Sequence, residues 1–382
     1  MSISARAHSI ADLRRLAQRR LPRAVFDFFD GGAEDERVLT GNCSAYRAHA
    51  LVPRVLRDVS QVSLTSTVLG QPSEMPLAIA PTGAVGFGWR GGDLAIARAA
   101  GRHGIPYSLS TSATASIEEI AAPGGPARRW FQCYILRKRA FTEALIDRAA
   151  AAGYEALMIT VDFAVGGKRE RDFRNDFAVP FRYTGRNMLD FASRPGWALP
   201  MLLQGLPVMK NLVGLEKQTV DAGALASSVG RSYDPAFDWD GLAQIRARWP
   251  GKLIVKGIVH RDDARRAVDC GADALVVSNH GGRQLDAGLA TLAALPAIAA
   301  AVGDRVEVLL DGGIRRGSDI VVALALGARA VLVGRATLFG VCADGEAGAN
   351  RALDLLHDEL RRTMQLCGVQ RVADIGPQLF EQ

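Results

Sequence analysis

The chain has 382 residues, of which 48% are hydrophobic and 23% are charged, and its formal net charge is +6 at pH 7. This balance is typical of a soluble globular protein with one large domain or two modest ones. The basic excess could attract anionic substrates or an anionic membrane surface, whereas no cluster of arginine and aromatic residues resembles a nucleic-acid reader, so we expect no nucleic-acid partner.

The cysteines and the apolar runs narrow the class further. The five cysteines lie far apart and form no CxxC pair, so they indicate neither a zinc site nor a disulfide framework, and we expect no metal. No apolar run reaches the length of a membrane span, and the first residues lack the charged-then-apolar pattern of a signal peptide. We therefore expect a protein of the reducing cytoplasm.

A repeated phrase begins at about residue 76: an alanine-rich helix, a glycine and a short β-branched run. It occurs as AAAGYEALMITVD, VDCGADALVVSNH and LALGARAVLVGR. Uniformly apolar runs of this length are typical of strands that are buried on both faces of a parallel sheet. The eight candidate strands are PLAIA, IPYSLS, RWFQCYI, ALMITV, LIVKG, ALVVS, EVLLD and AVLVG.

Eight strands that alternate with helices predict an α/β fold, a (β/α)8 TIM barrel over residues 76–382. An open, doubly wound sheet is the alternative, because periodicity does not show whether a sheet closes. Residues 1–75 are expected to form a helical N-terminal extension that packs on the barrel. Residues 181–234 interrupt the alternation after the fourth strand, and their length predicts a functional or mobile insertion.

Polar side chains stand at the ends of nearly all eight candidate strands. In a barrel of this kind, the carboxyl ends of the strands meet at one mouth, where the active site is built. The sequence therefore predicts a single polar site that combines Thr82, Ser110, Gln132, Tyr134, Thr160, Asp162, Lys256, Ser278, His280, Asp311, Gly334 and Arg335.

Two of these residues predict proton transfer. His280 lies at a strand end with Arg283 close by, and an imidazole can take and return a proton near neutral pH. Asp162 could stabilise the charged imidazole through a hydrogen bond. The alternative for Asp162 is an N-cap of the helix after the fourth strand.

Lys256 stands among apolar residues in IVKGI, where its ammonium group needs a partner. An anionic cofactor or substrate would supply one, and the alternative is an ammonium that reaches solvent at the barrel rim. A barrel without a bound cofactor that uses Lys256 for Schiff-base aldol chemistry is a further alternative of a different class.

The last two strands end in DGGIRRG (Asp311–Gly317) and in Gly334–Arg335. Glycines that expose backbone amides, with arginines and helix N-termini beside them, favour a bound anion. Barrels often place a phosphate after strands seven and eight, and here we expect the phosphate of a cofactor. The alternative is ordinary turn chemistry.

Taken together, the motifs resemble the FMN-dependent 2-hydroxy acid oxidase and dehydrogenase family over nearly the whole chain. SNHGGRQ (Ser278–Gln284) matches the active-site signature of that family and is highly specific. PTG, LSTSATASIEEI, WFQCYI and VDFAVGGKRERDFRNDF are most similar to its mandelate dehydrogenases.

The resemblance implies a role for each matching residue. His280 would take a proton from the α-carbon or from the hydroxyl group of the substrate, and Asp162 would stabilise the resulting imidazolium. Arg283 and Arg169 would bind the substrate carboxylate, and Tyr134 would donate a hydrogen bond to the substrate. Lys256 would stabilise the reduced, anionic FMN. The other cofactor-binding residues would be Pro81, Thr82, Gly83, Ser110, Gln132, Thr160, Ser278, Asp311, Gly312, Gly313, Arg315, Gly334 and Arg335.

Two substrate-binding positions differ from the family pattern. Phe28 replaces a tyrosine whose hydroxyl would touch the substrate, and the loss of one such hydrogen bond costs about 1.5–3 kcal/mol of binding. Ser112 replaces a bulky aromatic residue of glycolate oxidase. A small residue there opens the pocket and favours aryl or long alkyl side chains.

The first part of the insertion, residues 181–219, contains five basic and two acidic residues with apolar and aromatic residues between them. The resemblance to the mandelate dehydrogenases implies that this segment contacts a membrane. The charge of the segment is consistent with this, since an anionic leaflet attracts basic residues at about 1 kcal/mol each. The alternative is a soluble lid over the active site.

The sequence thus predicts an FMN enzyme that oxidises an L-2-hydroxy acid, mandelate-like, to the 2-keto acid and passes electrons to a quinone or respiratory acceptor. A soluble oxidase that produces H2O2 and an L-lactate dehydrogenase are the alternatives within the family, and a catalytically silent FMN-binding protein lies outside it. The resemblance also implies a homotetramer located in the cytoplasm, free or peripheral on the inner face of the membrane.

Overall fold

The computed structural model describes residues 2–177, 184–214 and 233–380. Eight parallel strands close into a barrel in the order β10-β3-β4-β5-β6-β7-β8-β9. Each coincides with a predicted run, so the (β/α)8 barrel is confirmed and the open sheet is wrong. The barrel strands are β3 (Leu77–Ile79), β4 (Tyr107–Ser110), β5 (Arg129–Cys133), β6 (Ala156–Thr160), β7 (Lys252–Ile258), β8 (Ala274–Val277), β9 (Glu307–Asp311) and β10 (Ala330–Val333).

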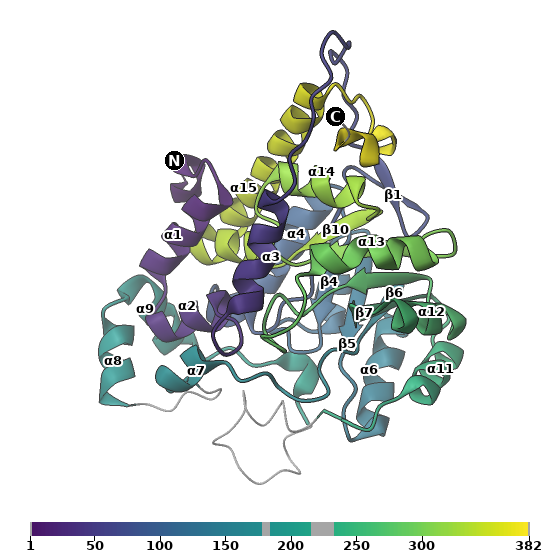
Figure 1. Cartoon of the computed structure of the whole chain (residues 1–382). Helices are drawn as coiled ribbons and strands as arrows, with labels where there is room; N and C mark the ends of the chain where they lie inside the picture. Colours follow the sequence, from purple (N-terminus) through teal and green to yellow (C-terminus); the bar gives the residue numbers. More distant parts are fainter. Residues whose placement is uncertain (1, 178–183, 215–232, 381–382) are drawn as a thin grey trace.

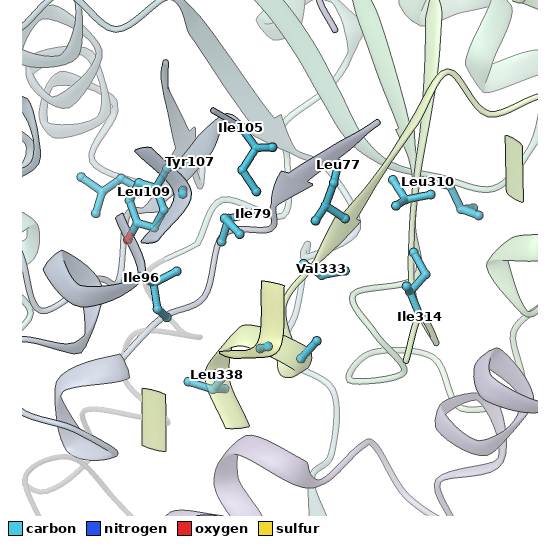
Figure 2. Packing of buried hydrophobic residues seen from close by; sticks show 14 of the residues in the cluster. Leu77, Ile79, Ile96, Ile105, Tyr107, Leu109, Leu310, Ile314, Val333 and Leu338 are labelled. Atoms are coloured by element: carbon cyan, nitrogen blue, oxygen red, sulfur yellow. The ribbon is translucent and has the colours of Figure 1, made fainter. Parts of the chain in front are cut away.

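Helices surround this barrel (Figure 1). Those that follow barrel strands are α4 (Gly92–Arg102), α5 (Ile117–Ala121), α6 (Arg139–Ala151), α7 (Glu170–Arg174), α11 (Trp239–Arg248), α12 (Arg261–Asp269), α13 (Thr291–Val302), α14 (Gly317–Ala325) and α15 (Arg335–Cys367). Short 3-10 turns lie at Ile3–Arg6, Val85–Phe87, Lys210–Leu212, Val372–Asp374 and Pro377–Leu379. Outward-facing strand residues pack against the helices, and Figure 2 shows Leu77, Ile79 and Val333 on two neighbouring strands of this outer layer.

The inward-facing strand residues form a second, separate core. Alternation along each strand sends residues such as Trp130, Met158 and Ile254 to the barrel axis, where they are fully buried. Val68 and Leu69 join this cluster from outside the barrel. Apolar side chains therefore fill the amino-terminal half of the barrel, and the polar strand ends occupy its carboxyl-terminal half.

Val68 and Leu69 belong to a hairpin, β1 (Ser66–Val68) and β2 (Gln71–Ser73), which pairs in antiparallel fashion. Leu69 and Gly70 both have positive φ, as a tight two-residue hairpin turn requires. Their N–H groups donate to the Glu307 carboxylate at 2.8 and 3.0 Å. The sequence predicted a helical extension before residue 76. The extension also contains this hairpin, which closes the amino-terminal end of the barrel.

Three helices precede the hairpin: α1 (Ile10–Arg20), α2 (Arg23–Asp30) and α3 (Arg37–Arg47). Ser9 caps α1, whose buried face packs along α15. The end of α2 and the start of α3 lie over the barrel mouth, where Ala33 N–H donates to the Gly282 carbonyl at 2.8 Å. The extension therefore supplies one wall of the site.

The insertion after β6 contributes α8 (Gly185–Ala192) and α9 (Pro195–Gln204), which lie beside α1 and α2 (Figure 1). Trp197 anchors α9, because its indole donates to the Phe87 carbonyl at 2.6 Å. Leu202 and Leu203, in contrast, are 80% and 75% exposed. None of the helices in the described ranges is long and apolar enough to cross a membrane.

Candidate active site

One cavity of about 210 Å³ lies at the barrel mouth and receives residues from all eight strand ends. The predicted residues that line it are Phe28, Pro81, Thr82, Gly83, Ser110, Ser112, Tyr134, Thr160, Arg169, Lys256, His280, Arg283, Asp311, Gly312, Gly313, Arg315, Gly334 and Arg335. Asp162, Gln132 and Ser278 stand behind this lining. Gln132, for example, donates to Thr160 at 3.0 Å.

His280 is held at both ring nitrogens. Its Nδ1 lies 2.9 Å from Asp162 Oδ1, and its Nε2 lies 3.1 Å from the Tyr134 hydroxyl. The helix that follows β6 is α7, whose N-cap residue is Arg169, so Asp162 does not cap it and that alternative is wrong. Burial raises the pKa of Asp162, but the charge and hydrogen bond of His280 outweigh burial and hold it below its usual range. An ionised Asp162 places the neutral imidazole proton on Nδ1, which leaves Nε2 as an acceptor for the Tyr134 hydroxyl.

The hydroxyl group of Tyr134 is protonated at neutral pH. Burial, assisted by the nearby negative charge of Asp162, raises the pKa of its hydroxyl well above the usual value. The hydroxyl is therefore a hydrogen-bond donor at neutral pH. Within the Asp162–His280–Tyr134 chain, Nε2 is the acceptor nitrogen of the imidazole, and both His280 and Tyr134 line the cavity, which is the arrangement a general base requires.

The backbone at His280 is in a left-handed conformation, with φ of +60°. Such a conformation costs a non-glycine residue on the order of 1–3 kcal/mol and persists only where the surroundings enforce it. Ser278 Oγ accepts the His280 N–H at 3.1 Å, and the next two residues, Gly281 and Gly282, continue the left-handed turn. This turn points the imidazole inward from the end of β8.

Lys256 is buried and paired. Its Nζ lies 2.8 Å from Asp311 Oδ2 and donates to Ser278 Oγ at 2.7 Å, so the predicted alternative of an ammonium in solvent is wrong. Burial lowers the pKa of Lys256, but Asp311 and Asp162 outweigh burial and raise it above the usual value. Lys256 therefore stays an ammonium, which has no lone pair for Schiff-base chemistry. The protein itself supplies an anionic partner that the sequence had assigned to a ligand.

Arg283 and Arg169 flank the ring of Phe28, with guanidinium carbons 5.2 and 5.3 Å from its centroid. Arg283 donates to the carbonyls of Phe28 and Gly31, at 2.7 and 3.2 Å. Among the described residues it forms no ion pair, whereas Arg169 pairs with Asp172 at 2.8 Å. Burial, with the positive charge of Arg169, lowers the pKa of Arg283 well below its usual value. An uncompensated buried cation favours a bound carboxylate.

The opposite end of the cavity fits a ligand with hydroxyl and phosphate groups. Asp311 Oδ1 is buried and has no hydrogen-bond partner in the described part of the chain, so a ligand hydroxyl would satisfy it. Arg315 makes no ion pair with any described residue, and α15 begins next to it at Arg335. A guanidinium without an ion pair and a helix N-terminus suit a phosphate.

Arg335 has a role that the sequence did not indicate. Three of its N–H groups donate to the carbonyls of Phe29, Gly281 and Gly31, at 3.1, 2.8 and 2.8 Å. Burial, followed by the charge of Arg315, lowers its pKa to about 10. Arg335 therefore joins α2 to the turn that carries His280, and only its remaining N–H groups are available to a phosphate.

The lining also contains apolar and aromatic residues that were not predicted, among them Phe29, Phe163, Met209 and Tyr233. The ring of Tyr233 lies 4.8 Å from Tyr134 and 4.6 Å from Phe163, centroid to centroid. Its hydroxyl interacts with Ser112, so the space that the small Ser112 was expected to open is partly filled by Tyr233. The sequence predicted a functional or mobile insertion over residues 181–234, but no feature of its pattern distinguished Tyr233 from its neighbours.

The chain is similar to known proteins over nearly its whole length. A model described as FMN-dependent dehydrogenase matches residues 17–382. The (S)-mandelate dehydrogenase of Pseudomonas putida is 42% identical over 373 residues, which cover 98% of this chain and 93% of that protein. The L-lactate dehydrogenase of Caulobacter vibrioides is 43% identical over 377 residues, with 98% and 97% covered.

The solved structures give the same picture. The crystal structure of the monotopic membrane protein (S)-mandelate dehydrogenase superposes with a TM-score of 0.93 at 41% identity, and the alignment covers 98% of this chain and 99% of that one.

Proposed function

The chain belongs to the FMN-dependent dehydrogenase family, and we propose that it oxidises an L-2-hydroxy acid to the 2-keto acid with FMN as its cofactor. One observation carries this proposal: a base held by a buried carboxylate and a pair of arginines with excess positive charge face the same cavity. A 2-hydroxy acid presents a carboxylate and an oxidisable carbon side by side, so it matches both groups at once.

When bound, FMN would supply the acceptor for the two electrons and for one of the two hydrogens that leave the substrate. We expect Arg315 and the backbone amides at the start of α15 to hold its phosphate, and Asp311 Oδ1 to accept a hydroxyl of its sugar chain. Lys256 would contribute a buried positive charge, fixed by Asp311 and Ser278, on the same side of the cavity. Such a charge favours the electron-rich form of a cofactor.

The protein residues then divide the remaining work. Arg283, with Arg169, binds the substrate carboxylate and orients the hydroxyl-bearing carbon toward His280. His280 Nε2 would take one of the two hydrogens as a proton, from the α-carbon or from the hydroxyl group, while the other hydrogen leaves the substrate with the two electrons. Asp162 stabilises the imidazolium that results, because it is ionised and bonded to Nδ1. Tyr134 donates to the substrate oxygen when the substrate displaces its bond to Nε2.

We propose a mandelate-like aryl acid as the substrate. The rings of Tyr134, Phe163 and Tyr233 lie together above the imidazole, and aromatic pairs add about 0.5–1.5 kcal/mol to the burial of apolar area. L-Lactate is the second candidate, because a relative of similar identity is named an L-lactate dehydrogenase. A small substrate would have no aromatic group to pack against these rings.

A panel of 2-hydroxy acids tests the substrate. Under anaerobic conditions, (S)-mandelate should bleach the flavin colour with a larger kcat/KM than L-lactate, and D-acids should leave the colour unchanged. A preference for L-lactate over (S)-mandelate would overturn the aryl assignment. Admitting air afterwards tests the acceptor: we propose a quinone, and rapid H2O2 production would instead indicate the soluble oxidase.

We also propose that the insertion contacts the inner face of the cell membrane. Leu202 and Leu203 lie three and four residues after Leu199 on α9, so both share a face with it, and the three leucines are 56–80% exposed. Met188 and Leu189 of α8 are also exposed. An exposed apolar face is part of the pattern of a peripheral membrane helix, and a solved relative, (S)-mandelate dehydrogenase, is described as a monotopic membrane protein.

Vesicle flotation decides between membrane contact and a lid. The unmodified protein should float with vesicles that contain anionic phospholipid, and Leu202→Asp combined with Leu203→Asp should abolish flotation. Leu366→Asp is the matched control, because this leucine is 69% exposed on α15 and should not matter. If the α9 variant floats normally but loses substrate affinity, the insertion is a lid.

We also propose that the protein is a homotetramer. Light scattering in detergent tests this proposal, because it measures the mass of the assembly.

A further inference from the structure

The turn that carries His280 is held from outside the barrel by an asparagine pair. Asn42 of α3 and Asn279, which precedes His280, are 237 positions apart. Asn42 Nδ2 donates to Asn279 Oδ1 at 2.8 Å, and Asn279 Nδ2 donates to Asn42 Oδ1 at 2.9 Å. Asn42 is only 1% exposed, so water does not replace these bonds.

Backbone groups fix the orientation of both amides. Asn42 Oδ1 also accepts the Thr291 N–H at 3.2 Å, and Asn279 Nδ2 also donates to the Leu289 carbonyl at 2.9 Å. The oxygen and nitrogen of each amide are therefore distinguished by neighbours outside the pair. Rotating either amide would place donor against donor and acceptor against acceptor.

Asn279 transmits this order to the turn. Its Oδ1 accepts the Gly282 N–H at 3.1 Å, across a turn in which His280, Gly281 and Gly282 all have positive φ. A side chain that bonds the backbone in this way stabilises a turn that a residue with a Cβ otherwise disfavours. α3 also closes on the turn sterically, because a Cβ at Gly282 would lie 2.7 Å from Leu39 Cα.

We propose that Asn42 is a positioning residue that keeps His280 aligned with Asp162 and Tyr134 by fixing the amide of Asn279. This inference rests on the proposed role of His280 as the base. Without Asn42, the Asn279 amide can rotate away from Gly282, and the left-handed turn relaxes. The imidazole then moves relative to the substrate carbon. Arg283 is held separately by the carbonyls of Phe28 and Gly31, so carboxylate binding should survive.

Two variants and one control test the proposal in the FMN-loaded protein. Asn42→Ala removes both bonds of the pair. Asn42→Asp keeps the size but sets a carboxylate oxygen against Asn279 Oδ1. Asn350→Ala is the matched control, because this asparagine is also buried and bonds a backbone carbonyl, of Glu346, but does not line the cavity.

Three measurements distinguish positioning from general destabilisation. For both Asn42 variants, the rate of anaerobic flavin reduction by (S)-mandelate should fall by about tenfold or more, since small misplacements of a catalytic group cost that much. Phenylglyoxylate is the 2-keto acid that mandelate oxidation produces, and it carries the same carboxylate. Its dissociation constant should change by less than about threefold. Hydrogen–deuterium exchange of the peptide 278–286 should accelerate in both variants and not in Asn350→Ala.

Unchanged reduction and exchange in the Asn42 variants would overturn the proposal, as would equal losses in Asn350→Ala or a parallel loss of phenylglyoxylate binding. If the unmodified protein is reduced by no 2-hydroxy acid, the proposed function fails instead. The exchange measurement then still decides whether Asn42 holds the turn.

Discussion

Asp162→Asn tests the electrostatic part of the site most specifically. The substitution keeps the size and a hydrogen-bonding atom near His280 Nδ1, but it removes the buried charge that stabilises an imidazolium. A hydrogen bond to a charged group contributes about 1.5–3 kcal/mol, and two unit charges 4 Å apart interact by about 4 kcal/mol at an effective dielectric constant of 20.

The Asp162 and His280 atoms are 2.9 Å apart, which places this pair toward the upper part of that range. We therefore expect a loss of roughly 2–4 kcal/mol in the transition state, or roughly 30- to 1000-fold in rate. Rapid mixing of the FMN-loaded variant with (S)-mandelate under anaerobic conditions measures this rate. Binding of phenylglyoxylate should stay nearly normal, because the arginines are untouched. Reduction within threefold of the unmodified rate would refute the assignment of Asp162.

Three further predictions follow from individual contacts. Phe28→Tyr should tighten phenylglyoxylate binding by about tenfold in a titration, because it restores a donor beside Arg283, and unchanged affinity would contradict this. Tyr233→Ala should lower the preference for (S)-mandelate over L-lactate, measured as the ratio of kcat/KM values, by about three- to tenfold, and an unchanged ratio would remove Tyr233 from the substrate pocket. Burial raises the pKa of Asp93 to about 6, so the folded state holds its proton to higher pH than the unfolded state, and the free energy of unfolding should fall by about 2 kcal/mol as pH rises from 4 to 6. Urea unfolding of Asp93→Asn should lack this component, and an identical pH dependence in both proteins would show that Asp93 does not cause it.

The strands and the members of the site were accessible from the sequence because they are local signals. A short apolar run after a glycine, such as ALVV before Ser278, identifies a buried strand by itself. A barrel also gathers the carboxyl ends of its strands without any knowledge of side-chain contacts. Residues as distant as Thr82 and Arg335 could therefore be assigned to one cavity, and both line it.

The partners within the site were less accessible, because they depend on contacts between distant segments. The pairing of Lys256 with Asp311 and the bond of Asn42 to Asn279 leave no pattern in the spacing of residues. The hairpin at Leu69 and Gly70 was missed because its strands, STV and QPS, are short and mostly polar and so form no apolar run. Tyr233 lies in an insertion without periodicity, so only the folded chain shows that it reaches Tyr134.

The central claim is that one cavity combines a flavin with His280 as the base. Anaerobic spectra of the FMN-loaded His280→Ala variant test it most directly, with the unmodified protein beside it. We predict that both proteins are yellow and that (S)-mandelate bleaches only the unmodified one. A protein that stays colourless after FMN is added, or a variant that bleaches at the unmodified rate, would contradict the claim.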